Sequence, residues 1–206
     1  MTGRLNKTFW TLLALLSVGV ALVSYRYLPK IGPMAPAILQ NLFARPWLDV
    51  HVVGAATALL IGPFQFLPGV RARHRWLHRW MGRTYVVACL VGGVAGMVMA
   101  FGTTAGPVAT AGFGGLATLW IIANVQGWRL AMARRFDEHR AWMIRSFALT
   151  FAAVTLRLYL PLIPLTDMPF IEGYRAISFL CWVPNLVIAE LYIRATAMRR
   201  MSAKTA

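Results

Sequence analysis

The chain has 206 residues, of which 59% are hydrophobic, and it carries 21 Lys and Arg residues against 6 Asp and Glu. Charged residues make up 13% of it, which is about half the share found in an ordinary soluble domain. A net charge of +15 would suit a nucleic-acid-binding protein, but no hydrophilic body is present to carry such a surface. The composition therefore excludes nucleic acid as a partner and predicts a protein of the lipid bilayer.

Six apolar runs, each near the roughly 20 residues that a helix needs to cross the hydrocarbon, predict an all-α polytopic membrane bundle. No connecting segment is long enough to form a soluble domain, so we expect residues 1–206 to form one integral membrane domain. The first run is long for a signal-peptide core and lacks a clear small-x-small cleavage site, which predicts a retained helix. The predicted helices cover about residues 9–28, 47–68, 82–101, 111–133, 141–164 and 176–195.

Basic residues lie at the ends of these runs and are much more numerous on one side of the membrane than on the other. Lys and Arg are concentrated in 4–7, 71–83, 129–140 and 194–204, and these segments all fall on the same side of the membrane. The other side holds few basic residues. By the positive-inside rule, both termini are expected in the cytoplasm, with the protein in a bacterial inner membrane.

A weak internal repeat appears when the sequence is shifted by 61 residues, so that 54–79 is compared with 115–140. "HRWMGR" at 78–83 then meets "HRAWMIR" at 139–145 after a slip of one residue. We interpret the second and third helices, and the fourth and fifth, as a duplicated hairpin. Such a hairpin brings His78 and His139 to the same depth at the cytoplasmic face. The polar matches are Gln65 with Gln126, Arg73 with Arg134, His78 with His139 and Arg79 with Arg140.

The His-Arg corners of this repeat have two interpretations. Trp and Arg at a membrane boundary favour simple interfacial anchoring. Alternatively, His78 and His139 form a paired-imidazole site, in which they ligate the iron of a b-type haem while Arg79 and Arg140 hold its propionates. His74 and His78 are four residues apart and share a helix face, as metal ligands do, but the sequence shows no third ligand.

Ionisable and polar residues inside the apolar runs indicate where a function would lie. On the fifth helix, His139, Ser146, Thr150 and Arg157 fall along one line, and this polar seam should face the bundle interior. Arg145 lies off that line, where it either reaches the headgroups or pairs with Glu190 on the sixth helix.

The outer end of the bundle holds a second polar group. Asp49 is the best anionic partner for Arg157, with His51 hydrogen-bonded beside the pair. The functional alternative is an outer site for a quinone headgroup, a haem propionate or a proton. Cys89 and Cys181 each lie in an apolar run and are expected to be small core residues.

Several motifs together carry a resemblance to a known family. They are "LLIGPFQFLPGVR", "HRWMGRTYVVACLVGGVAGMVMA", "GFGGLATLW", "HRAWMIRSFALTFAAVTLRLYLPL" and "CWVPNLVIAE". In this order, over about 47–193, the chain resembles the bacterial family of integral membrane proteins known as domain of unknown function 2306. The resemblance implies a multi-helix membrane protein but no established activity. A looser similarity to membrane b-type cytochromes and ferric-reductase-like domains is one of fold only.

Three functions follow from these observations. The first is a haem- or quinone-linked redox protein, an oxidoreductase component, and the paired His residues favour it. The second is a small transporter or proton-coupled carrier, which the duplicated hairpin favours. The third is a non-catalytic scaffold or assembly factor that binds a partner protein in the membrane. The oligomeric state and any bound cofactor stay open at this level.

Overall fold

The computed structural model describes residues 2–32 and 36–205, and the side chains of 7–32 and 38–198. Within these residues the regular structure is entirely helical. The elements, in order, are α1 (Thr2–Ser24), η1 (Tyr25–Tyr27), α2 (Pro36–Leu39), α3 (Ala44–Gln65), α4 (Pro68–Arg73), α5 (Arg75–Phe101), α6 (Pro107–Met132), α7 (Phe136–Thr150), α8 (Ala152–Tyr159), η2 (Leu160–Leu165), α9 (Phe170–Leu180) and α10 (Val183–Thr205).

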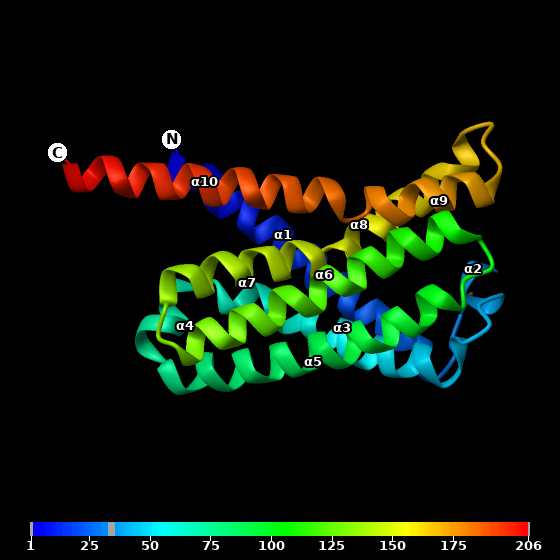
Figure 1. Cartoon of the computed structure of the whole chain (residues 1–206), viewed down its shortest axis with the longest axis horizontal. Coiled ribbons are helices and arrows are strands. Elements are labelled where there is room, and N and C mark those ends of the chain that lie inside the picture. Colours follow the sequence, from blue (N-terminus) through cyan, green and yellow to red (C-terminus); the bar gives the residue numbers. More distant parts are fainter. Residues whose placement is uncertain (1, 33–35, 206) are drawn as a thin grey trace.

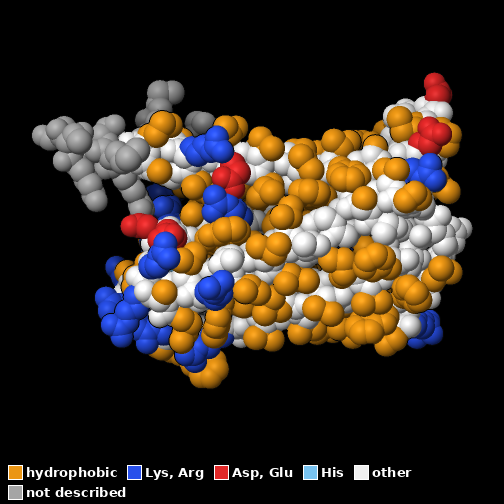
Figure 2. All heavy atoms as spheres, in the orientation of Figure 1, with side chains coloured by type: hydrophobic (Ala, Val, Ile, Leu, Met, Phe, Trp, Pro, Cys, Tyr) orange, Lys and Arg blue, Asp and Glu red, His pale blue; other side chains and the backbone are white. Residues whose placement is uncertain are grey.

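Six spans are long and apolar enough to cross a membrane, which confirms the predicted all-α bundle of six transmembrane helices. Figure 2 shows hydrophobic side chains along the body of the molecule, with Lys and Arg gathered mainly at one end. The spans are Lys7–Tyr27, Ala44–Gln65, Arg75–Phe101, Pro107–Met132, Phe136–Leu165 and Phe170–Met198.

The helices α3, α5, α6 and α7 form the centre of the bundle (Figure 1). Helix α1 packs against α3, while α9 and α10 pack against α6 and α7. The crossing of α3 and α5 is especially close, because a Cβ at Gly54 would lie 2.6 Å from the backbone nitrogen of Gly92. Small residues permit this close approach. In lipid, where no hydrophobic driving force holds helices together, the van der Waals contacts of such close packing stabilise the pair.

Both hairpins of the expected repeat are formed, by α3 with α5 and by α6 with α7. His78 and His139 occupy corresponding places in the first turns of α5 and α7. The backbone nitrogen of His78 donates to the carbonyl of His74, and that of His139 to the carbonyl of Arg135. The two histidines therefore lie at the same end of the bundle (Figure 1).

Several helix boundaries differ from those that hydropathy predicts. Helix α5 begins at Arg75 and α7 at Phe136, earlier than the predicted 82 and 141, because a helix continues beyond the apolar stretch that marks the hydrocarbon. The sixth span is divided into α9 and α10 just before Pro184, which has no backbone N–H to donate into a continuous helix.

The described ends of the chain lie at the same end of the molecule as α4 and the α6–α7 turn (Figure 1). This arrangement agrees with six crossings, while the cytoplasmic placement of that end stays a prediction. Some of the basic residues behind the prediction lie outside the residues whose side chains are described. These are Arg4, Arg199, Arg200 and Lys204.

Candidate functional site

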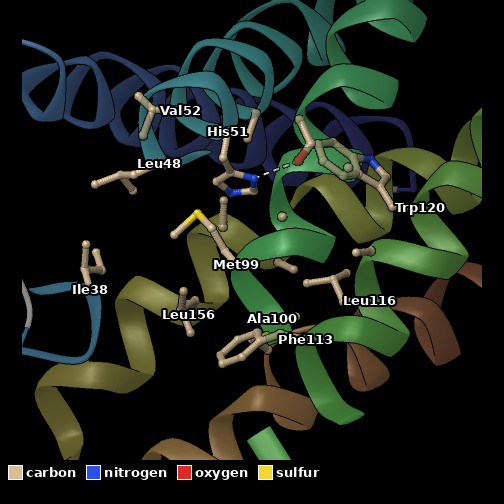
Figure 3. Close-up of a pocket in the computed structure, with 18 of the residues that line it drawn as sticks. Ile38, Leu48, His51, Val52, Met99, Ala100, Phe113, Leu116, Trp120 and Leu156 are labelled. Atoms are coloured by element: carbon tan, nitrogen blue, oxygen red, sulfur yellow. Dashed lines mark hydrogen bonds between the residues drawn. The ribbon is translucent and has the colours of Figure 1, made fainter. Parts of the chain in front are cut away.

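A cavity of about 210 Å³ lies in the bundle at the end remote from His78 and His139. Its walls come from the second half of α5, the first half of α6, and parts of α2, α3, α7, α8 and α9, with Tyr27 from η1. Most of the lining is aliphatic or aromatic (Figure 3). We call it the His51 cavity, and its polar or distinctive lining residues are His51, Asn41, Met99, Thr103, Trp120, Thr150, Arg157 and Tyr174.

His51 has a fixed orientation at the wall of this cavity. Its Nδ1 lies 2.8 Å from the carbonyl oxygen of Gly92 on α5 (Figure 3). A carbonyl only accepts hydrogen bonds, so Nδ1 carries the proton in this contact. The neutral ring then has its lone pair on Nε2, which has no hydrogen-bond partner among the described residues. An imidazole held in this way presents Nε2 to a ligand.

Glycines on α5 make room for the His51 ring. A Cβ at Gly96 would lie 3.0 Å from Nδ1 of His51, closer than nearly all real contacts of this kind. The tight crossing at Gly54 brings the Gly92 carbonyl within reach of the ring. Because these glycines have no side chains, the imidazole of His51 can lie directly against α5.

Trp120 and Thr150, which line the cavity, also belong to a buried hydrogen-bond network. Nε1 of Trp120 donates to Oγ1 of Thr150 at 2.9 Å, and Thr150 also contacts the hydroxyl of Tyr85 at 2.8 Å. Tyr85 reaches Oγ of Ser146 at 2.9 Å, and Ser146 donates to Oδ1 of Asn124 at 3.0 Å. The network satisfies these polar groups in the middle of the bundle.

The predicted polar seam of the fifth span does face the interior. Ser146 and Thr150 are buried in the network, and Arg157 lines the His51 cavity. Tyr85, Trp120 and Asn124 belong to the network but were not among the residues predicted from the sequence. The signal for Asn124 was available, since an amide in the middle of an apolar run needs an internal partner.

The expected ion pair between Asp49 and Arg157 is wrong. Arg157 instead donates from Nη1 to the carbonyl of Ala153 and from Nη2 to Oγ of Ser24, both at 2.9 Å. No salt bridge joins Asp49 to any described residue. Residues two apart on a helix point to different sides, so with His51 turned into the bundle, Asp49 on the same helix does not line the cavity.

The histidine corner lies at the opposite end of the bundle. Nδ1 of His139 contacts the carbonyl of Gly127 at 2.8 Å, whereas Nδ1 of His78 is buried without a partner. Among the described residues, no group of three His, Cys, Asp or Glu side chains is placed to hold a metal ion, so the His74–His78 pair gains no third ligand. A haem between His78 and His139 stays a prediction.

The other polar residues of the two corners are less connected. Arg79 is exposed and Arg140 is half-buried, and neither forms an ion pair with a described residue. Nε2 of Gln65 is buried without a partner, and its Oε1 lies beside Gly82 on α5. Gln126 is half-buried on α6. These residues do not converge on one ligand in the way that the lining of the His51 cavity does.

The pairing of Arg145 with Glu190 is confirmed. Both guanidinium nitrogens Nε and Nη2 contact the carboxylate, at 2.5 and 3.0 Å, and the guanidinium also lies over the ring of Trp142. This two-point contact fixes α7 against α10. Cys89 and Cys181 are buried free thiols, as expected of core residues.

Comparison with known proteins bears on this geometry. The family described as a predicted membrane protein, DUF2306, matches residues 48–193. The chain belongs to this family. Comparisons with curated proteins and with solved structures gave no match. The DUF2306 segment contains nearly all of α3 and continues into α10, so it holds His51, Trp120 and Arg157. Ser24 and Tyr27, which also belong to the site, precede it.

Proposed function

We propose that this protein binds the ring of a lipid-soluble quinone in the His51 cavity and takes part in quinone-linked electron transfer. The observation that carries the proposal is the presentation of His51 Nε2 at an apolar intramembrane cavity, with Nδ1 held by Gly92. Ligand sites in proteins commonly combine mostly apolar walls with a few placed polar groups.

The size of the cavity suits such a ring. A cavity of about 150 Å³ is enough to bind benzene, and the His51 cavity measures about 210 Å³. The cavity is also partly open, so it does not have to enclose the apolar tail of a quinone. Leu116, Leu156 and Phe113 supply apolar contacts for the faces of the ring (Figure 3).

His51 also suits the chemistry of a quinone. When its ring is neutral, Nε2 accepts the hydrogen bond of a quinol hydroxyl and takes that proton as the quinol is oxidised. When its ring is protonated, Nε2 donates to a quinone carbonyl. The proton moves between the ligand oxygen and Nε2, while Nδ1 keeps its bond to the Gly92 carbonyl. Oxidation of a quinol to a quinone removes two electrons and two protons. The electrons pass to a separate one-electron or two-electron acceptor, Nε2 takes one proton, and the second proton leaves the other hydroxyl for water; reduction reverses each transfer.

The lining also distinguishes this proposal from a cation-coupled carrier. None of the described residues that line the cavity is Asp or Glu. Many carriers coupled to protons or sodium ions use an acidic residue near the middle of the membrane. The cavity offers cationic and neutral hydrogen-bonding groups, which suit a carbonyl or hydroxyl oxygen.

Binding of menadione, a methyl-substituted naphthoquinone, tests the proposal. Quenching of tryptophan fluorescence in detergent, checked by equilibrium dialysis, should show saturable binding. Replacing His51 by Leu fills the same space with an apolar side chain but removes the hydrogen bond to the ligand, and should weaken binding about tenfold. His74→Leu is the matched control, because His74 is exposed at the other end of the bundle and should leave binding unchanged. Absence of saturable binding by the unaltered protein would reject the proposal.

A further inference from the structure

Arg157 is a guanidinium held inside the membrane-spanning part of the bundle. It lies on α8 in the fifth span and lines the His51 cavity. A charged side chain at such a position is costly, and membrane proteins usually pair it or use it to recognise a ligand.

Among the described residues, no carboxylate compensates this charge. The salt bridges between described residues join Arg135 to Glu138 and Arg145 to Glu190, and neither involves Arg157. The described lining of the cavity contains no Asp or Glu. The two contacts of Arg157 are to neutral oxygens, those of Ala153 and Ser24. The positive charge is therefore available to an occupant of the cavity.

Ser24 holds the guanidinium in place. The Ser24 hydroxyl donates its proton to the carbonyl of Val20 at 2.6 Å, which leaves the oxygen lone pairs to accept from Arg157 Nη2. A guanidinium carries five N–H donors, and these contacts occupy only part of them. Arg157 is thus fixed at the wall while still able to donate to a further acceptor.

From this geometry we infer that the occupant of the His51 cavity carries an oxyanion on an apolar body, and that Arg157 is the residue that recognises the oxyanion. The inference takes the ring of the ligand from the proposed function and adds that the ligand carries a negative charge. A reduced quinone bears such an oxygen when its hydroxyl is ionised, and so does the carboxylate of a fatty acid. Both place a negative oxygen beside apolar surface.

Lawsone, a hydroxynaphthoquinone that is ionised at neutral pH, and its uncharged methyl ether provide matched probes. The unaltered protein should bind lawsone at least about tenfold more tightly than the ether. Arg157→Gln should remove this preference, so that lawsone and its ether bind the variant with similar affinity. Ser24→Ala, which keeps the charge but frees the guanidinium, should reduce the preference in part. Arg79→Gln is the control, because Arg79 is exposed at the opposite end and should change nothing.

The outcomes separate this inference from the proposed function. Equal affinity of the unaltered protein for lawsone and its ether overturns the inference without any variant, even if menadione binds. A preference that persists in Arg157→Gln also overturns it. Decanoate is the second probe. If decanoate binds through Arg157 while no quinone binds, the oxyanion inference holds, its source is a fatty carboxylate, and the quinone function fails.

Discussion

Single side chains in the middle of this bundle are held by partners on other helices. Tyr85 is the clearest case, because its buried hydroxyl contacts both Ser146 and Thr150, at 2.9 and 2.8 Å. Thr150 also receives Nε1 of Trp120 and lines the His51 cavity, so the network joins the wall of the site to the core. Hydrogen bonds of this kind between membrane helices contribute about 0.6 kcal/mol each on average.

Replacing Tyr85 by Phe should lower the free energy of unfolding by about 1 kcal/mol, because two such contacts are lost. The measurement is the midpoint of unfolding as the denaturing detergent fraction increases. Tyr159→Phe is the matched control, since the Tyr159 hydroxyl has no hydrogen bond to a described residue, and it should leave the midpoint unchanged. Equal midpoints for the two variants would show that the network adds no stability.

The helix pair α3 and α5 is set by glycine contacts. At Gly54, a Cβ would meet the carbonyl oxygen of Ala88 and the nitrogen of Gly92, both at 2.6 Å, and backbone atoms cannot move aside as a flexible side chain can. This crossing of α3 and α5 also brings His51 to the Gly92 carbonyl. The geometry of the site therefore depends on the closeness of one helix pair.

Gly54→Val should separate α3 from α5 and lower the free energy of unfolding by about 2 kcal/mol, as overpacking typically does. It should also weaken menadione binding by at least about tenfold, because the Gly92 carbonyl would leave His51 and the wall of the cavity would move. The same unfolding titration and fluorescence assay measure both effects. Gly19→Val on α1 is the control, since a Cβ at Gly19 meets nothing within 4 Å. Unchanged stability in Gly54→Val would show that this crossing is not under steric constraint.

The whole molecule has two chemically different ends. One end carries the His78 and His139 corners with exposed basic residues of α4 and the start of α5, and the other carries the His51 cavity. Figure 2 shows the contrast as a gathering of Lys and Arg at one end. The positive-inside rule predicts that the basic end faces the cytoplasm, so the cavity would lie in the outer half of the membrane.

Labelling with a membrane-impermeant maleimide tests this orientation. Thr104→Cys, in the exposed turn between α5 and α6, should react in intact cells, because it lies at the cavity end. Ala133→Cys, in the exposed turn between α6 and α7, should react only after the membrane is opened. Cys89 and Cys181 are buried and provide a low background. Labelling of Ala133→Cys alone in intact cells would invert the predicted topology.

The sequence by itself determined the class of this protein, its six spans and its inward polar seam. These features depend on local hydropathy and on the helical period, which place Ser146 and Thr150 on one face whatever surrounds them. The pairing of Arg145 with Glu190 could also be predicted from the sequence, because Glu190 is one of the few carboxylates in the chain and lies at the same end of the bundle as Arg145.

Only the tertiary structure decided which polar residues meet in the site. Sequence favoured Asp49 as the partner of Arg157, but Ser24 on the first helix occupies that place. The rotation of each helix about its axis sets such contacts. Here that rotation depends on glycine crossings such as Gly54 with Gly92, a packing effect that no local pattern encodes. The sequence suggested a site at the paired histidines and, as an alternative, an outer site near His51. The cavity lies around His51, while the histidine site stays a prediction.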